Sequence, residues 1–407
     1  MSVSSSSFPE SYCALGLMKN IDNHLSPRKH DNDSKDQTSS SYKTIKELKL
    51  SLNTIYSFTS TKTIFSPSIQ NNKQNDTLSN LSINFILSAF NNEKSTIILL
   101  KNIMEKPKEN LNNIINMISG YYSLIIKNNN GNIFCSDLFK VCDKNQRIKI
   151  LKEICNTISE DCIHKYASHP IQTLIELASC EEEYKLIVMS FNDSMKILKA
   201  ALNKNGAYAI QKLIIYIPEK FRMEFNLLFV KYIRILAMDI YGVCTVIKFL
   251  KYTNNEIIEQ QLLDVILSNF VKISQNQYGN YIIQKILEQW WNSNKGLYLK
   301  KICIDQFHVL ATHCYSSYVC DMFLKLSDIG DKKVLMSNLT GFKNLNLLNC
   351  NNNTKIIINK LMNALESKEG YNFNNNKNTS SNNNNINITI IKEEKNDGKN
   401  NIKQNKK

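Results

Sequence analysis

Two carboxamide side chains stand four residues apart in the segment QYGNYIIQKIL, which covers residues 277–287. On a helix, Asn280 and Gln284 would lie side by side on one face, with the ring of Tyr281 beside them. The apolar residues of the segment gather on the opposite face, which suits burial in a core. Each carboxamide offers a hydrogen-bond donor and an acceptor on a short stem. The polar face therefore predicts a partner with complementary donors and acceptors.

The composition indicates a folded protein with a polyanionic partner. The chain has 407 residues, of which 43% are hydrophobic, and a formal net charge of +14. Most of the cationic residues are lysines. The arginines number four: Arg28, Arg147, Arg222 and Arg234. A strongly basic chain attracts polyanions such as nucleic acids. A biased coding composition rich in Asn, Lys and Ile would produce the same excess, so both explanations stay open.

The eleven cysteines do not form a recognisable metal site. No CxxC pair occurs, and no Cys/His cluster has zinc-finger spacing, so we expect reduced structural thiols with neither a metal nor a cofactor. The N-terminus has no basic region followed by an apolar run, and no segment approaches about 18 uncharged apolar residues. These features predict an intracellular protein that does not enter a membrane. The absence of GxSxG, P-loop and HExxH motifs argues against an enzyme.

Composition divides the chain into two tails and a periodic middle. Residues 1–76 are rich in Ser, Asn, Lys and Thr, and residues 368–407 are Asn/Lys low complexity. Neither tail can bury an apolar face, so both are predicted to be disordered. In residues 77–367, apolar residues recur at helical spacing and polar turns interrupt them. This middle part is predicted to be all helix.

Four glycines recur in one phase of the middle part: Gly131, Gly206, Gly242 and Gly279. Their separations are 75, 36 and 37 residues, and the first is about twice each of the others. Each glycine precedes an apolar helix, where it suits a tight turn. Equivalent steps along the chain reach four further positions, which are Lys94, Ala167, Ser316 and Asn353. The sequence thus predicts eight helical units stacked on one another across residues 77–367.

The helix that follows each small residue resembles the second helix of the Pumilio (PUF) RNA-binding repeat. The resemblance rests on the segments YGNYIIQKIL, NGAYAIQKLI, YASHPIQTLI and YSSYVCDMFL. It implies an all-α, right-handed and crescent-shaped solenoid of about eight three-helix repeats. In that family, the residue after the small position and the one four beyond it contact a base edge. The residue between them stacks on bases.

By this resemblance, two units read a defined base with a tyrosine as the stacking residue. Asn280 and Gln284, with Tyr281, imply uracil. Ser317 and Asp321, with Tyr318, resemble the guanine-reading Ser/Glu pair, although Asp is one methylene shorter than Glu. The chemistry suits single-stranded RNA because its base edges are free. Stacking on a tyrosine ring contributes about 1 to 3 kcal/mol per base.

Two further units follow the same pattern, and the remaining four depart from it. Ser168 and Gln172 resemble an adenine-reading pair, with His169 stacking. In the next unit, Ala207 and Gln211 with Tyr208 lose one base contact, so we expect loose selectivity there. The Gly242 unit offers Val243, Cys244 and Ile247, which cannot hydrogen-bond a base edge, and the Gly131 unit departs similarly. The terminal units are expected to act as caps.

One lysine follows the second contact position in three units: Lys212, Lys248 and Lys285. They are candidate phosphate contacts, because a row of cations would attract the RNA backbone. Solvated surface lysines would produce the same pattern, and the sequence does not separate the two explanations.

The resemblance implies a sequence-selective protein that binds single-stranded RNA. We expect GU-containing elements in mRNA 3′ untranslated regions, with regulation of translation or stability in the cytoplasm. Protein co-repressors are candidate partners, and a monomer is expected. One alternative is a nucleolar PUF-like protein of ribosome biogenesis with relaxed sequence preference. Another is a helical-repeat protein scaffold, although that gives no reason for Gln to recur in one phase at Gln172, Gln211 and Gln284.

Overall fold

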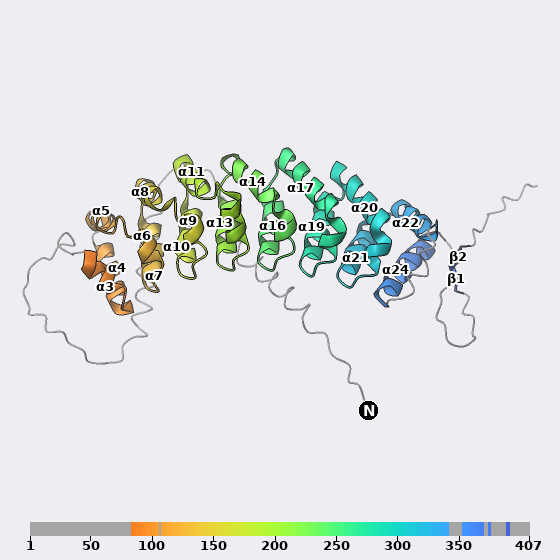
Figure 1. Cartoon of the computed structure of the whole chain (residues 1–407), viewed down its shortest axis with the longest axis horizontal. Helices are drawn as coiled ribbons and strands as arrows, with labels where there is room; N and C mark the ends of the chain where they lie inside the picture. Colours follow the sequence, from red (N-terminus) through yellow and green to blue (C-terminus); the bar gives the residue numbers. More distant parts are fainter. Residues whose placement is uncertain (1–82, 106, 342–351, 370–372, 376–387, 391–407) are drawn as a thin grey trace, which may run out of the picture. The chain divides into compact units, whose positions relative to one another are not determined.

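The computed structural model describes residues 83–105, 107–341, 352–369, 373–375 and 388–390. The predicted N-terminal tail, residues 1–76, lies outside these residues. From residue 83 to residue 369 the described elements are helices that follow one another in layers (Figure 1). The predicted all-α solenoid is confirmed, and its helices form three rows.

The front row holds the helices that follow the small residues. In the described part of the chain its members are α4 (Glu93–Glu105), α7 (Gly131–Val141), α10 (Ser168–Leu177), α13 (Gly206–Tyr216), α16 (Gly242–Tyr252), α19 (Gly279–Trp290), α21 (Ser317–Leu326) and α24 (Asn352–Glu369). Each of these helices packs on the next one along the chain. The row therefore presents the equivalent positions of successive units side by side.

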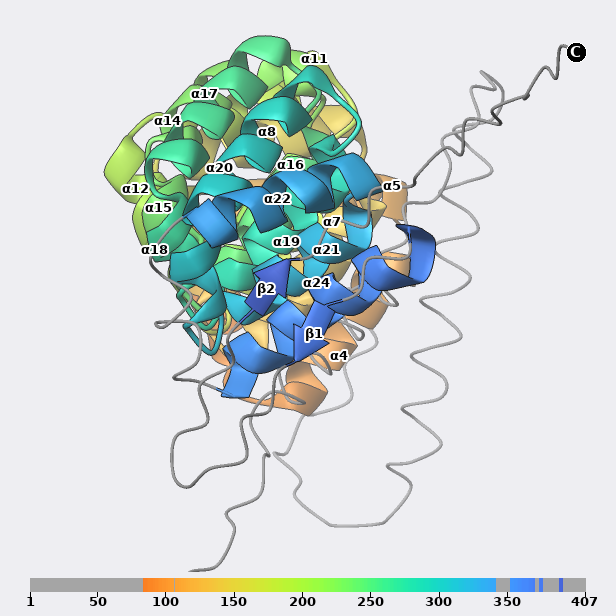
Figure 2. The ribbon, with the colours of Figure 1, turned by 90° about the vertical axis from the view of Figure 1, so that its right-hand side faces the viewer.

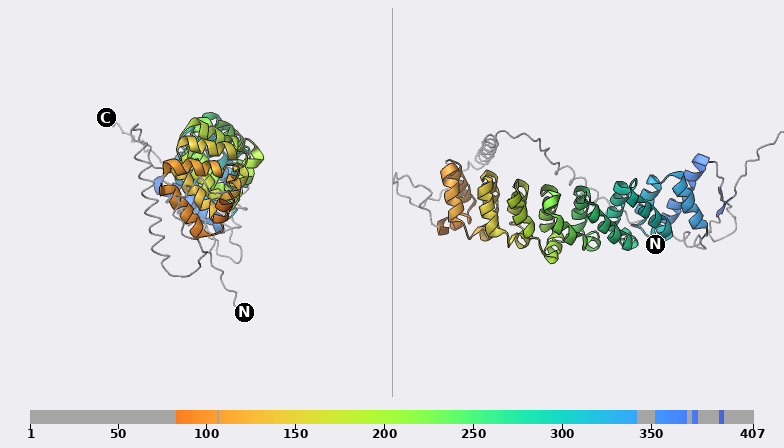
Figure 3. Two further views of the ribbon diagram at one scale, coloured as in Figure 1. Left: turned by 90° about the vertical axis from the view of Figure 1, so that its left-hand side faces the viewer. Right: turned by 90° about the horizontal axis from the view of Figure 1, so that it is seen from above.

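The back row covers the other side of the front row. Its described members are α5 (Pro107–Met117), α8 (Lys144–Ile154), α11 (Glu181–Met189), α14 (Met223–Val230), α17 (Glu256–Ser268), α20 (Asn294–Ala311) and α22 (Ile329–Gly341). The short 3-10 helix η2 (Glu219–Phe221) packs on α11. Seen from above, the layers stand one after another (Figure 3).

Short helices precede the front-row helices and form the edge row. They are α3 (Ile83–Ala89), α6 (Tyr122–Ile126), α9 (Ile158–Asp161), α12 (Ser194–Ala201), α15 (Ile233–Leu236) and α18 (Phe270–Ser274). Figure 2, which looks along the array, shows α12, α15 and α18 together on one side of it. In the next unit, α20 runs unbroken through the positions that α17 and α18 divide between them.

A side-chain acceptor closes the turn before six of the front-row helices. Asn128, Asn203, Asp239 and Asn276 accept two backbone N–H groups each, at 2.8–3.1 Å, from the residues two and three positions later. In two other units, the acceptor is the Nδ1 atom of His164 or His313, which lies 3.3–3.5 Å from the backbone nitrogens that donate to it. Asn and Asp favour such turns because their oxygens bond the backbone two residues on. This acceptor three residues before the small position is a repeat signal that the glycine spacing alone did not reveal.

The glycines are required by a close approach of two backbone segments. A Cβ added at Gly131, Gly206, Gly242 or Gly279 would lie 2.3–2.5 Å from the carbonyl oxygen six residues earlier. Ser316 occupies the equivalent position in its unit, and its Oγ donates to the Leu310 carbonyl oxygen at 2.6 Å. That carbonyl is also six residues earlier. The small residue thus lets the front-row helix start against the helix that precedes it.

The core lies between the front and back rows. Phe229 of α14 lies 4.6 Å from Phe249 of α16 between ring centroids, and Phe307 of α20 lies 6.2 Å from Phe323 of α21. All four rings are fully buried. Aromatic pairs at these separations add about 0.5–1.5 kcal/mol to the stabilisation from burial. The core therefore continues from each unit into the next.

Buried polar groups also join neighbouring back-row units. The guanidinium of Arg147 on α8 donates to Glu183 of α11 at 2.8 Å, and both side chains are nearly inaccessible. Arg222 donates to the Ile217 carbonyl oxygen at 3.1 Å and to Asn226 Oδ1 at 2.7 Å, and it also reaches the Tyr252 carbonyl oxygen. Burial lowers the pKa of Arg222 from its usual value. These contacts fix the register of one unit on the next.

The predicted C-terminal tail contains a short strand pair. β1 (Phe373–Asn375) pairs antiparallel with β2 (Ile388–Ile390), with Phe373 opposite Ile390. The ITI segment of β2 consists of β-branched residues, which favour strands. The low-complexity composition around it had indicated no structure.

Candidate nucleic-acid interface

The structure brings Asn280 and Gln284 together at the start of α19. Gln284 Nε2 donates to Asn280 Oδ1 at 3.0 Å. Asn280 Nδ2 donates to the carbonyl oxygens of Asn276 and Gln277 at 3.0 and 2.9 Å, and the residue is only 2% exposed. The two carboxamides therefore differ in position. Asn280 closes the turn and holds Gln284, whereas Gln284 is partly exposed and retains a free acceptor oxygen.

Ser168 and Gln172 repeat this arrangement on α10. Gln172 Nε2 donates to Ser168 Oγ at 2.9 Å, and Ser168 Oγ donates to the Asn205 carbonyl oxygen of the next unit at 2.9 Å. Ser168 is buried and Gln172 is partly exposed. In both units a small buried polar residue thus orients a glutamine that lies one turn further along the helix.

The structure does not bring Ser317 and Asp321 together by a hydrogen bond. Ser317 Oγ donates to the Cys314 carbonyl oxygen at 2.7 Å. Asp321 Oδ1 lies 2.5 Å from Lys360 Nζ of α24, and both side chains are about half exposed. A base at this position would compete with Lys360 for the carboxylate.

In the Gly206 unit, the predicted base contact Gln211 is buried. Gln211 is 4% exposed and Ala207 is 3% exposed, because both neighbouring front-row helices, α10 and α16, pack on α13. Gln211 is therefore not presented to a ligand in this conformation. In the Gly242 unit, Val243 is 4% exposed and Cys244 is partly buried, with its thiol pKa raised by burial. These two units offer few hydrogen-bonding groups to a base.

The predicted stacking residues lie on the front surface. Tyr208 and Tyr318 are each 52% exposed, and His169 is also exposed. Tyr281 is partly buried, and its pKa is raised by burial and by the nearby hydroxyls of Tyr318 and Tyr315. Tyr208, Tyr318 and His169 therefore offer exposed ring faces on which bases can stack.

A second group of tyrosines was missed from the sequence. It stands immediately before the small position, in Tyr166, Tyr241, Tyr278 and Tyr315. Tyr241 and Tyr315 are each 38% exposed, and the ring of Tyr315 lies 5.8 Å from that of His313. The recurring Tyr before Gly, Ala or Ser was the available signal.

The three candidate phosphate contacts have different surroundings. Lys212 pairs with Glu176 of the preceding unit. Lys285 is exposed and lies 2.8 Å from Glu288. Lys248 is 4% exposed, so the packing of α16 removes it from the surface on which it was predicted. Lys165 and Lys204, in the turns before α10 and α13, are exposed cations that the sequence reasoning missed.

The terminal units direct their polar residues inward. Thr354 Oγ1 donates to the Ala311 carbonyl oxygen at 2.9 Å, and Thr96 Oγ1 donates to the Ala89 carbonyl oxygen at 3.1 Å. Both threonines are buried.

Among the described residues, no group of three or more His, Cys, Asp or Glu side chains could hold a metal ion. Among the described helices, none is both long and apolar enough to cross a membrane.

A family model of the Pumilio-family RNA binding repeat matches residues 127–155, 196–224 and 269–290. The chain is 29% identical over 194 residues to Pumilio homolog 12 of Arabidopsis thaliana, covering 46% of this chain and 32% of that protein. It is 23% identical over 264 residues to a Pumilio domain-containing protein of Schizosaccharomyces pombe, covering 64% of this chain and 38% of that protein. The chain thus spans only about a third of the length of these relatives.

Solved structures share the fold. The RNA-binding domain of yeast Puf5p bound to AAT2 RNA matches with a TM-score of 0.62 and 19% identity, over 70% of this chain and 84% of that one. The Puf4 RNA binding domain bound to the HO endonuclease RNA 3′ UTR recognition sequence matches with a TM-score of 0.61 and 17% identity, over 69% of this chain and 88% of that one.

Proposed function

Because this chain belongs to the Pumilio (PUF) family of RNA-binding repeat proteins, we propose that it binds single-stranded RNA along its front row with selectivity for sequence. The glutamines of two units carry the proposal. Gln284 and Gln172 are each held by a hydrogen bond to the residue four positions earlier, and each is partly exposed beside an aromatic side chain. A preorganised carboxamide next to a stacking ring can read one base edge.

The order of the units leads to a specific element. By the family's antiparallel binding, the Ser316 unit meets the RNA before the Gly279 unit. We therefore expect 5′-G-U, then two loosely read positions, then adenine opposite Ser168 and Gln172. Gln211 and Val243 are both nearly inaccessible, which supports weak base selectivity at the two middle positions of the RNA.

The biological role that fits such an element is regulation of mRNA through its 3′ untranslated region. Translation or stability of the message would be controlled in the cytoplasm, by a monomer that recruits protein co-repressors and performs no catalysis. The Puf4 RNA binding domain is bound to a 3′ UTR recognition sequence in its solved structure, which supports the proposal by analogy.

A second candidate is a role in ribosome biogenesis in the nucleolus, with relaxed sequence preference. The burial of Gln211, together with the pairing of Asp321 with Lys360, favours it, because both reduce base readout.

Selection of bound RNAs from a random pool, followed by sequencing, distinguishes the two. A short enriched motif that contains GU is the result expected for an mRNA regulator. Enrichment of RNA structure without a motif would favour the nucleolar role. Failure to enrich any RNA would contradict RNA binding altogether.

A further inference from the structure

Exposed cations without acidic partners gather on the edge row. We name five of them the edge strip: Lys196 and Lys199 on α12, Lys231 and Arg234 at α15, and Lys272 on α18. Lys199, Lys231 and Lys272 are exposed, and the other two are partly exposed. Within the part of the chain that the structure describes, none of the five forms an ion pair.

Lysines elsewhere on the array are often neutralised. Lys127 lies 2.6 Å from Asp161, Lys295 lies 2.8 Å from Glu259, and Lys300 lies 3.0 Å from Asp331. An exposed acid stands beyond each end of the edge strip, at Glu160 of α9 and Asp305 of α20, and a third, Asp193, caps α12 within it. The five cations of the edge strip therefore belong to three successive units.

The edge strip lies beside the start of the front row. Each short helix ends five or six positions before the front-row helix of its unit begins, and α12, α15 and α18 each pack on that helix. An RNA strand that leaves the front surface at the beginning of these helices can reach the edge strip without crossing the back row. The front-row helices of two of these units are the ones that offer a base few polar groups, α13 and α16.

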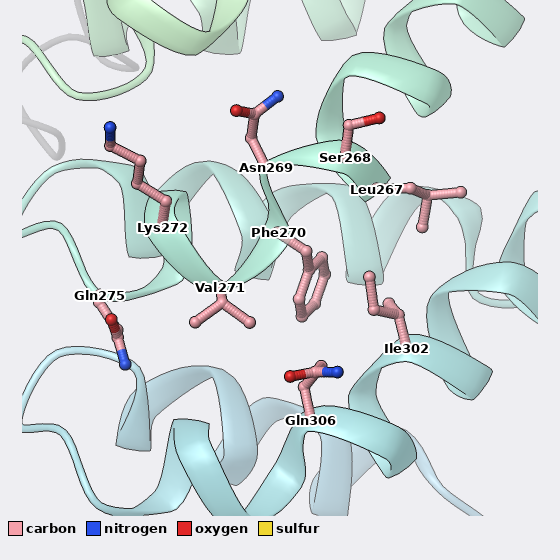
Figure 4. Close-up of a pocket in the computed structure, with 9 residues that line it drawn as sticks. All are labelled: Leu267, Ser268, Asn269, Phe270, Val271, Lys272, Gln275, Ile302 and Gln306. Atoms are coloured by element: carbon pink, nitrogen blue, oxygen red, sulfur yellow. The ribbon is translucent and has the colours of Figure 1, made fainter.

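A cavity of about 520 Å³ adjoins Lys272, and we name it the edge cavity. It lies between the junction of α17 with α18 and the unbroken helix α20 (Figure 4). Its apolar lining includes Phe270, Val271 and Ile302. Pockets for small ligands commonly measure about 300–1,000 Å³, so the cavity has room for a nucleobase.

Two glutamines supply polar groups to the edge cavity. Gln275 follows α18 and Gln306 stands on α20, and both side chains are partly exposed. Neither carboxamide has a hydrogen-bond partner among the described residues, whereas that of Asn269 donates to the Val265 carbonyl oxygen at 2.8 Å. Two unpaired carboxamides over an apolar lining suit the edge of a base, and Lys272 at the rim suits its phosphate.

We propose that the edge strip and the edge cavity form a second contact surface for single-stranded RNA, which rests on the proposed RNA binding of the front row. The nucleotides that flank the front-row element turn back along the edge row, where the edge strip binds their phosphate chain. The edge cavity holds one unpaired base of that flank. A row of cations on successive helices, which pack about 8–10 Å apart, matches a repeating polyanion better than a single anionic group.

The test compares two RNAs on the full chain by fluorescence anisotropy. One spans only the front row, at about one nucleotide per helix, and the other adds flanking nucleotides at both ends. The edge variant carries Lys199→Gln, Arg234→Gln and Lys272→Gln. A control variant carries Lys144→Gln, Lys220→Gln and Lys301→Gln, which remove the same charge from the back-row side.

The wild type should bind the extended RNA about tenfold more tightly than the short one, and the edge variant should lose this difference. The salt slope of the edge variant on the extended RNA should fall by about 2, at about 0.7 per lost phosphate contact. The control variant should retain the difference. If both variants bind the short RNA as tightly as the wild type does, their helical arrays are folded.

A crosslink locates the base independently of these variants. A 4-thiouridine in the flank should crosslink to the segments that carry Gln275 or Gln306, and Gln275→Leu with Gln306→Leu should abolish that crosslink. If the wild type binds the short RNA but gains nothing from the flank, the second surface is wrong while the proposed function stands. If poly-glutamate displaces the flank as readily as oligo-uridine does, the surface binds acidic protein segments instead. If neither RNA binds, the proposed function itself fails.

Discussion

At the scale of single residues, the two carboxamides of α19 divide their tasks. Asn280 uses both of its N–H groups on the turn before the helix, and its oxygen receives a bond from Gln284. An RNA base that approaches Gln284 therefore meets a side chain that has already lost much of its conformational freedom. The side chain of Gln284 therefore loses most of its conformational entropy when the protein folds, and loses little more when it binds RNA.

The base preference of the Gly279 unit can be changed by two substitutions. Gln284→Glu with Asn280→Ser should move the preference from uracil toward guanine, because a carboxylate accepts hydrogen bonds from the guanine edge. Affinity for the original RNA should fall by about 1 to 3 kcal/mol. Anisotropy on four RNAs that differ only at this base measures both effects. Gln261→Glu, an exposed change on α17 with the same charge, is the control, and equal weakening on all four RNAs would contradict base reading.

The buried thiols predict a loss of stability at alkaline pH. Burial raises the pKa of the Cys142 and Cys162 thiols to about 12, whereas a thiol in the unfolded chain titrates at about 8.5. The unfolded state therefore releases its protons first. The stabilisation is fully present below about pH 8.5 and is lost as pH rises toward 12, by about 1.4 kcal/mol per thiol for each pH unit.

Denaturant unfolding under reducing conditions at several alkaline pH values tests this sign. Cys162→Ala should make the decline shallower, and Cys314→Ala, at an exposed thiol, should leave it unchanged. A decline of the same steepness in both variants would show that other groups cause it.

The sequence predicted the types of the site residues better than their exposure. The phase of Asn280, Gln284 and Tyr281 was visible because equivalent positions recur from unit to unit along the sequence. The burial of Lys248 and Gln211 was not, because it depends on helices that lie a whole unit away. The pairing of Lys212 with Glu176 joins different helices in the same way.

At the scale of secondary-structure elements, each short edge-row helix lies so close to the front-row helix after it that a small residue is needed where the front-row helix begins. Gly279→Ala would place a Cβ 2.3 Å from the Ile273 carbonyl oxygen. We expect a loss of about 1–3 kcal/mol in the free energy of unfolding, as for other overpacked sites. Gly330→Ala is the matched control, because its nearest neighbour is a side-chain atom of Asp328 at 3.2 Å. Urea unfolding should separate the two, and equal stability would contradict the steric explanation.

The buried ion pair between α8 and α11 gives a second prediction at this scale. Arg147→Met should destabilise the protein by about 3–5 kcal/mol, because it leaves the carboxylate of Glu183 buried without its partner. Adding Glu183→Leu should recover much of this loss, since no unpaired charge remains. Lys152→Met, in an exposed pair with Glu182, should change little. A double variant less stable than Arg147→Met would rule out this account.

The helical elements were predictable because their spacing and small residues repeat. The acceptor turn was overlooked because three residue types perform one function: Asn, Asp and His all present an acceptor to the same two N–H groups. A search for identical letters does not detect such chemical equivalence.

At the scale of the whole molecule, the repeat array should act without the tails. A chain cut to residues 77–367 should fold and bind the selected RNA as well as the full chain does, because segments of low-complexity composition are expected to bury little apolar surface. Calorimetry and anisotropy on both chains provide the comparison. Binding weaker by about tenfold, or 1.4 kcal/mol, in the shortened chain would place part of the recognition in the tails.

Each layer of the array packs mainly on the layers immediately before and after it. No contact between distant parts of the sequence has to form before the rest can follow, so folding can nucleate in any sufficiently stable pair of units and spread in both directions. A defect in one unit would then divide the array into two segments that fold separately. The units around α13 and α16, which offer few polar groups to a base, would still be needed to transmit folding cooperativity from one end of the front row to the other.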